Sequence, residues 1–403
     1  MEEHTQRGSV DRFPNGDTKE QSLLDLSASN STAEIVAPSV GPQETKQKIY
    51  SIQHLRWFAA TLVVLRHALG HFPDELTSRN PLTRSGEFGV DIFFVISGFI
   101  LWYISAQSRP RPVPFLLNRI TRVYPPYWFF TLVMVATAIV LPKAFRFAYV
   151  KPLFVVKSLL LFPAWHPVLH AINPVLPIGW TLQYEVFFYL LFALMLLLPP
   201  SRRLLGNLAA LVLLVALGRL IHFSSPPLHV YTDLPLLEFG AGMVIGALYE
   251  KRRLVPPVLG IVMAMAALVW MYPMTAFVAS DCRALAWGPP AALLVYGILS
   301  AEHGTRAAWN LRLLELLGDA SYSLYLCHLF ALGILRMAWK PFPQFGTTAC
   351  VLYVLAATLL ATAMGLLTHV YLEKPTVKAM RRVVKHLLRE KKSTKVFSVA
   401  IRS

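Results

Sequence analysis

The sequence is dominated by apolar runs that are long enough to cross a lipid bilayer. A helix of about 20 apolar residues spans the hydrocarbon core, and a helix satisfies its own backbone hydrogen bonds in lipid. Charged residues make up only 15% of the chain, against about 25% in ordinary soluble domains. We therefore expect an all-α, polytopic integral membrane protein with about ten transmembrane helices. The runs cover residues 52–71, 88–106, 123–142, 178–198, 205–222, 234–250, 257–275, 284–300, 320–339 and 348–372.

Two polar segments flank these runs. Residues 1–47 are rich in Glu, Ser, Thr, Asp and Gln and poor in aromatic residues, so they cannot bury enough apolar surface to become ordered. The C-terminal end is basic, and we expect it to lie on anionic lipid. The chain is thus divided into a disordered N-terminal tail (1–47), a membrane domain (48–376) and a basic C-terminal tail (377–403).

The distribution of Lys and Arg predicts the orientation in the membrane. With ten spans and a cytosolic start, the inner connections and the tail carry more than twice as many Lys and Arg residues as the outer connections. Such an excess marks the cytosolic side, so both termini are expected there, in a cell inner (plasma) membrane protein. The net charge of +16 follows mostly from this asymmetry and from the basic tail, and a nucleic-acid partner is not needed to explain it.

The first apolar run contains two ionisable residues, Arg56 and His67. Charged or titratable groups at membrane depth are expensive and usually serve a function. Eleven positions separate the two residues, so they share one helix face about 16 Å apart along the axis. This spacing lines up a fixed cation and a titratable base. Alternatively, Arg56 extends to the lipid headgroups and His67 hydrogen-bonds a neighbouring helix.

Two acidic residues also lie inside apolar runs. Asp91 is near the predicted outer end of the second run, as His67 is of the first, so the carboxylate is expected to orient the imidazole and raise its basicity. Asp91 as a helix cap is the alternative. Glu185 in the fourth run is either catalytic or paired with a buried cation such as Arg56. The small residues Ser97 and Gly98 predict a close contact between helices.

Further candidates are paired along the sequence. Arg119 and Arg122 lie one turn apart on the predicted cytosolic side, a fork suited to phosphate, unless they only mark the cytosolic flank. Tyr325 and His328 share a helix face and either line a polar interior or are satisfied core groups. The three cysteines have no metal-ligand spacing, and we expect no metal.

Six motifs, taken in their order along the chain, resemble those of the acyltransferase 3 family. Its members are the membrane-bound O-acyltransferases of bacterial surface polysaccharides and some small natural products. The resemblance covers about residues 48–376. The motifs are Arg56 with His67, residues 89–99 (GVDIFFVISGF), Arg119 with Arg122, residues 180–185 (WTLQYE), residues 322–328 (YSLYLCH) and residues 373–375 (EKP).

The resemblance implies transfer of an acyl group, most often acetyl, from cytosolic acyl-coenzyme A to a hydroxyl of an exported or lipid-linked saccharide such as exopolysaccharide. No permanently bound cofactor is expected, because acyl-coenzyme A is a co-substrate. His67 would be the general base or a transient acyl carrier. Its expected partners in the reaction are Asp91 and Glu185. The expected donor- and substrate-binding residues are Arg56, Arg119, Arg122, Trp180, Tyr325 and His328.

Two other classes of protein also place ionisable residues in a membrane. A transporter does so along its substrate pathway, although corresponding broken helices in two halves, typical of inverted repeats, are not apparent in the sequence. A non-catalytic scaffold does so to join its helices. Within the enzyme class, a small secreted molecule as acceptor and succinyl as the acyl group are the alternatives.

Overall fold

In a computed structural model of the chain, the structure describes residues 49–72, 86–141, 148–274, 283–340 and 346–386, without the side chains of residues 273–274 and 306–307. The predicted N-terminal tail (1–47) and residues 387–403 of the predicted C-terminal tail lie outside the described residues. The first ten residues of that C-terminal tail, 377–386, are helical.

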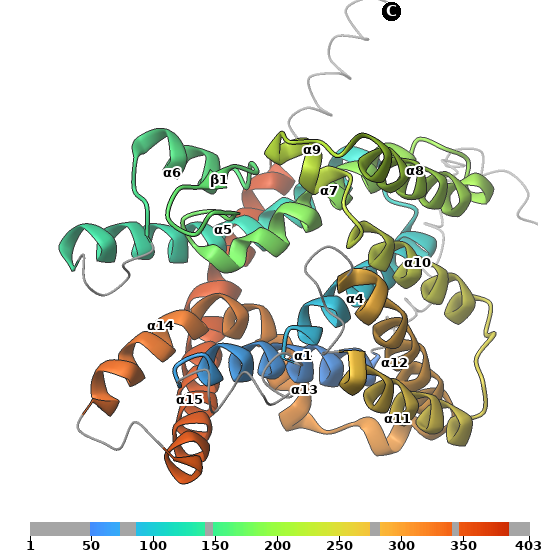
Figure 1. Cartoon of the computed structure of the whole chain (residues 1–403). Helices are drawn as coiled ribbons and strands as arrows, with labels where there is room; N and C mark the ends of the chain where they lie inside the picture. Colours follow the sequence, from blue (N-terminus) through green and yellow to red (C-terminus); the bar gives the residue numbers. More distant parts are fainter. Residues whose placement is uncertain (1–48, 73–85, 142–147, 275–282, 341–345, 387–403) are drawn as a thin grey trace, which may run out of the picture. The chain divides into compact units, whose positions relative to one another are not determined.

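The described chain is mostly helical, which confirms the predicted all-α class (Figure 1). A short antiparallel ladder pairs β1 (Trp165–His166) with β2 (Ala171–Ile172) between α6 and α7. The longer helices are α1 (Tyr50–Leu69), α4 (Phe88–Ser108), α5 (Pro112–Val140), α7 (Trp180–Met195), α8 (Pro200–Ile221), α10 (Leu236–Glu250), α11 (Pro257–Met274), α12 (Arg283–Thr305), α14 (Ser321–Trp339) and α15 (Thr347–Thr368). The shorter elements are α6 (Pro152–Leu159), η1 (Pro177–Gly179), α9 (Pro226–Tyr231), η3 (Arg306–Trp309), α13 (Arg312–Asp319) and the π-helical turn η4 (His369–Glu373).

Seven helices in the described part of the chain are long and apolar enough to cross a membrane. Each of the ten predicted runs coincides with a helix, but three of these helices fall short of that standard. α1 carries several polar residues, α10 has only 15 residues, and the apolar part of α11 is short. The predicted number of ten spans therefore stays a prediction. The seven are α4, α5, α7 with η1, α8, α12, α14 and α15 with its continuation to His386.

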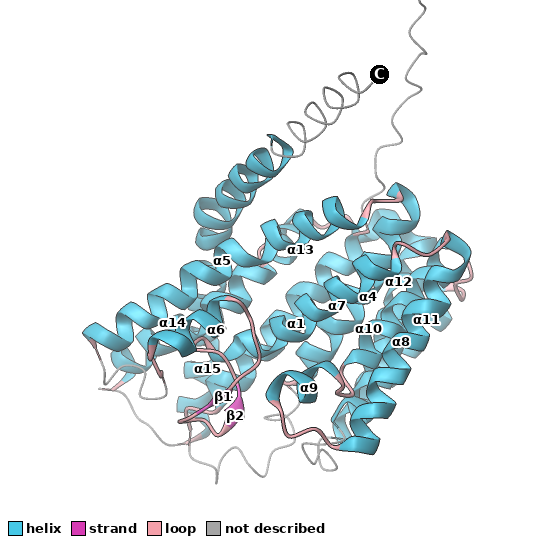
Figure 2. Cartoon of the chain, turned by 90° about the horizontal axis from the view of Figure 1, so that it is seen from above, coloured by secondary structure: helices cyan, strands magenta, loops and turns pink. Residues whose placement is uncertain are grey.

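Helix α1 lies at the centre of the helical assembly in two perpendicular views (Figures 1 and 2). It packs against α4 and α12 on one side and against α14 and α15 on another, with α13 close to its beginning. Its first turn is held by Glu302 of α12, whose carboxylate accepts the backbone N–H groups of Tyr50 (2.9 Å) and Ser51 (3.0 Å). These donors have no partner within a helix, so Glu302 fixes the start of α1 and with it the height of Arg56.

Helix α4 is held tightly to α10. At Gly98 a Cβ atom would collide with the Phe239 backbone, and at Gly242 of α10 it would collide with the Val95 carbonyl. Only glycine permits this approach of two backbones, so the predicted close contact at Ser97 and Gly98 is confirmed. The neighbouring Ser97 side chain is turned toward a cavity between the helices.

Candidate active site

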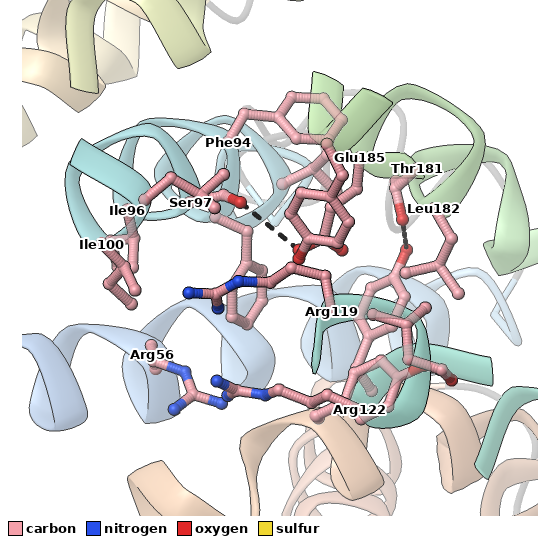
Figure 3. A pocket seen from close by; sticks show the side chains of 17 residues that line it. Arg56, Phe94, Ile96, Ser97, Ile100, Arg119, Arg122, Thr181, Leu182 and Glu185 are labelled. Carbon is pink, nitrogen blue, oxygen red and sulfur yellow. Dashed lines mark hydrogen bonds between the residues drawn. The ribbon is translucent and has the colours of Figure 1, made fainter. Parts of the chain in front are cut away.

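An inner cavity lies among α1, α4, α5, α7 and α14, with about 820 Å³ of empty space that is partly open to solvent (Figure 3). By the predicted topology this is the cytosolic half of the helices. The cavity collects side chains from sequence segments that are far apart. Its polar lining residues are Arg56, Ser97, Arg119, Arg122, Thr181, Glu185, Tyr189, Tyr322 and Tyr325.

Three arginines line the inner cavity without a carboxylate partner among the described residues. Arg56 is only 8% exposed and donates one hydrogen bond, to Gln53 Oε1 at 3.2 Å. The Arg119 guanidinium lies over the rings of Phe115 and Tyr189, 5.5 and 6.0 Å from their centroids. A buried cation that lacks an ion-pair partner is costly. Arg122 repels both Arg56 and Arg119. Glu185, the single carboxylate among the described lining residues, attracts Arg56 and Arg119 without forming an ion pair with either. The cavity is therefore suited to a ligand with several negative charges.

Glu185 is hydrogen-bonded inside the same cavity. Its carboxylate accepts hydrogen bonds from Ser97 Oγ at 3.3 Å and from the Tyr189 hydroxyl one turn further along α7. Within the described chain it forms no ion pair with Arg56. Glu185 thus belongs to the arginine-lined cavity and lies in a different cavity from His67.

An outer cavity of about 1120 Å³, likewise partly open to solvent, contains His67. The Nδ1 atom of His67 lies 2.8 Å from the Val63 carbonyl oxygen. Since a carbonyl only accepts, Nδ1 carries the hydrogen and Nε2 keeps a lone pair. The contact with Val63 therefore leaves Nε2 as the basic nitrogen of the imidazole, and a general base needs such a nitrogen to accept a proton. The other polar lining residues are Arg66, Glu87, Asn173, Trp180, Arg283 and Tyr325.

The second predicted histidine, His328, lies against the first. The two rings are 4.9 Å apart between centroids. His328 is fully buried, and its Nδ1 lies 2.6 Å from the Tyr325 carbonyl oxygen. His328 is therefore a packed neighbour of His67, whereas Tyr325 lines both cavities.

Asp91 has a different partner from the predicted one. Its carboxylate pairs with Arg283 Nη2 at 2.7 Å, and no hydrogen bond joins it to His67 in the described residues. Arg283, the first residue of α12, lies between the rings of Trp180 and Trp287, 5.4 and 5.5 Å from their centroids. The physical reason is that the Arg283 guanidinium, at the start of α12, reaches the buried Asp91 carboxylate on α4. Its full positive charge attracts the carboxylate more strongly than a neutral imidazole does. Asp91 therefore shapes the wall of the outer cavity through Arg283.

Breaking this buried pair is expected to destabilise the protein. Asp91→Ala removes the ion-pair partner of Arg283, and Glu238 then remains as the buried carboxyl group beside it. Breaking a buried pair in this way costs about 3–5 kcal/mol. We expect a clearly lower thermal unfolding temperature of the detergent-solubilised protein, partly restored in the double variant Asp91→Ala/Arg283→Met. Glu87→Ala is the matched control, since its pair with Arg66 is 36% exposed on both sides and is worth at most about 1 kcal/mol. Equal unfolding temperatures for the Asp91 and Glu87 variants would contradict the assignment.

The two cavities meet at Val90 and Tyr325, the two residues that line both. The Tyr325 hydroxyl donates to the Ile178 carbonyl at 2.9 Å and lies 2.9 Å from Thr181 Oγ1. A small molecule in the inner cavity and one in the outer cavity would therefore face each other across these two side chains.

Several residues of the site had no assigned role in the sequence interpretation. Tyr189 is four residues after Glu185, a spacing that places both on one helix face and was a usable signal. Arg283 lies between two apolar runs of the sequence, and Glu238, buried beside Asp91 and Arg283, lies in an apolar run without a motif. Over the described ranges, no three His, Cys, Asp or Glu side chains are arranged to hold a metal ion.

Comparison with known proteins gives the family. The profile described as an acyltransferase domain matches residues 49–368. The exopolysaccharide production protein ExoZ of Rhizobium meliloti (strain 1021) is 38% identical over 296 residues, which cover 73% of this chain and 91% of that protein. Acyltransferase MdmB of Streptomyces mycarofaciens is 27% identical over 385 residues, covering 83% and 93%. No solved structure matches significantly. These matches agree with the motifs found in sequence order, and the chain belongs to the acyltransferase 3 family.

Proposed function

We propose that this membrane acyltransferase moves an acyl group from acyl-coenzyme A in the inner cavity to a saccharide hydroxyl in the outer cavity. The observation that carries the proposal is the set of three arginines without carboxylate partners in one cavity, Arg56, Arg119 and Arg122. Coenzyme A supplies a diphosphate and a 3′-phosphate, the kind of polyanion that guanidinium groups bind best.

The distance between the cavities suits the donor. Arg56 and His67 lie on the same helix, about 16 Å apart at 1.5 Å per residue, and an extended pantetheine arm is of similar length. With its phosphates at the arginines, the coenzyme would present its thioester near Val90 and Tyr325. Glu185, hydrogen-bonded to Ser97 and Tyr189, is then a donor-site residue.

The reaction needs one base on the acceptor side. His67 Nε2 takes the proton of the acceptor hydroxyl while its oxygen attacks the thioester carbonyl carbon. The tetrahedral intermediate collapses with cleavage of the C–S bond. The leaving thiolate then takes the proton from the imidazolium, so the histidine returns to its neutral form. Trp180 and Arg283 in the outer cavity provide an aromatic face and a charged edge for the acceptor.

The relative with the higher identity supports a saccharide acceptor, because its name describes exopolysaccharide production. We propose an exopolysaccharide repeat unit or a related exported or lipid-linked saccharide as the acceptor. The test is mass spectrometry of surface glycan from a strain lacking the gene. The glycan should lose one acyl substituent and regain it with the wild-type gene but not with His67→Ala. A glycan that keeps all its substituents would overturn the proposed acceptor.

We also propose ten spans in the cell inner (plasma) membrane, with both termini cytosolic. This arrangement puts Arg119 and Arg122 toward cytosolic coenzyme A and His67 toward the exported acceptor. Several exposed basic residues of the final described helix would then lie at the anionic inner surface, among them Lys378, Arg381, Arg382 and Lys385.

Cysteine labelling tests this topology after replacement of Cys282, Cys327 and Cys350. In intact cells, Ser108→Cys at the end of α4 should react only with membrane-permeant reagents, because the proposed topology puts this position on the cytosolic side. Val168→Cys in the β1–β2 turn should react with impermeant reagents. Both native positions are exposed, so access depends on the side of the membrane. Impermeant labelling at position 108 would contradict the topology.

A further inference from the structure

Val90 and Tyr325 are the two residues that line both cavities. We propose that these two side chains bound the opening through which the acyl group reaches His67, and that the size of Val90 restricts the donor to acetyl and similarly small acyl groups. The inference rests on the proposed acyl transfer between the cavities and adds the residue that selects the acyl group.

Tyr325 forms the fixed side of the opening. It is only 6% exposed, and its hydroxyl is held by the Ile178 carbonyl and Thr181. Its ring meets Phe93 edge-on, with centroids 6.0 Å apart. Its backbone carbonyl is also the partner of His328 Nδ1. Any movement of Tyr325 would break several of these contacts, so the tyrosine cannot turn aside for a larger group.

Val90 forms the other side, and its backbone is held by both neighbours. Gly89 packs so closely on α1 that a Cβ atom would collide with the Ala59 carbonyl. Asp91 is tied to α12 through Arg283 at 2.7 Å. A β-branched side chain on a helix also has one strongly preferred rotamer. With the backbone and the rotamer both restricted, the volume of the side chain itself determines the width of the opening.

The apolar surroundings of the opening allow it to select acyl groups by size. Val90 and Tyr325 are both 6% exposed and belong to the same apolar core as Val63 and Phe94. In such surroundings each extra methylene that does not fit lowers kcat/KM by roughly 10-fold to 200-fold. Removing two methyl groups at Val90 should therefore admit acyl chains that the wild-type opening rejects.

The test compares purified wild type and Val90→Ala with acetyl-, propionyl- and butyryl-coenzyme A. The ratio of kcat/KM for butyryl to that for acetyl should rise at least about 10-fold in Val90→Ala. Val95→Ala is the matched control, because Val95 lies on the same helix, is fully buried and lines neither cavity. Its ratio should equal that of the wild type.

Val90→Ile makes the opposite and milder change. It adds one methylene, keeps the branched shape and should lower the ratio of propionyl to acetyl transfer, so the inference can be tested even if Val90→Ala folds poorly. Acyl preferences that stay at the wild-type values in the folded Val90 variants would overturn the inference. Failure of the wild type to use any acyl-coenzyme A would instead overturn the proposed function.

Discussion

Replacing His67 with Ala is expected to lower acyl transfer at least about 100-fold while the protein still inserts into the membrane. A general base typically raises the reaction rate 10²-fold to 10⁴-fold. Among the described residues that line the outer cavity, His67 is the one histidine. The measurement is the rate of coenzyme A release in the presence of acceptor, with purified protein in detergent or liposomes.

The control for this variant is His54→Ala. His54 lies on the same helix, stacks on Trp309 and lines neither cavity, so its removal should leave turnover near the wild-type value. A folded His67→Ala protein with near-normal turnover would contradict the mechanism. Intact-protein mass spectrometry with donor alone separates a base, which forms no adduct, from an acyl carrier, which gains the acyl mass.

Arg119→Ala and Arg122→Ala are each expected to raise the KM for acyl-coenzyme A at least about 10-fold. Hydrogen bonds to a charged group contribute about 1.5–3 kcal/mol, and these contacts lie far from the reacting carbon, so kcat should change less than KM. Lys should restore donor affinity poorly if the contact to phosphate is bidentate. Acyl-coenzyme A titrations of initial rates give both constants.

Arg111→Ala provides the comparison for the arginine variants. Arg111 lies just before α5, is exposed and lines neither cavity, so the variant removes a cation near the same helix end without touching the cavity. Its KM should stay unchanged. If Arg119 and Arg122 can also be replaced without a change in donor affinity, they serve only to orient the protein and the donor site lies elsewhere.

The helices and the positions of Arg56, His67, Arg119 and Arg122 along them could be predicted because those features are local. An apolar run specifies its own helix, and two residues eleven positions apart on one helix keep their spacing in any packing. The number of membrane spans could not be fixed, since α1 is too polar and α10 and the apolar part of α11 are too short for hydropathy to decide.

The partner of Asp91 could not be predicted from sequence. Arg283 is 192 positions away, and its guanidinium reaches Asp91 only because α12 packs beside α4. The same reason hid the junction at Val90 and Tyr325. Both residues lie in motifs of the sequence, residues 89–99 and 322–328, but the motifs do not tell that the two side chains line the same two cavities. That arrangement depends on the close approach of α1 to α4 at Gly89 and on the hydrogen bonds of Tyr325 to the beginning of α7.

The central claim is that donor and acceptor reach His67 from opposite cavities. It is tested most directly in liposomes containing the purified protein in one known orientation, with radiolabelled acetyl-coenzyme A on one face and the saccharide acceptor on the other. We predict labelled acceptor only when the coenzyme is on the face of the α4–α5 connection, and none with His67→Ala. Labelling only when donor and acceptor share one face, or equal labelling by His67→Ala, would contradict the account.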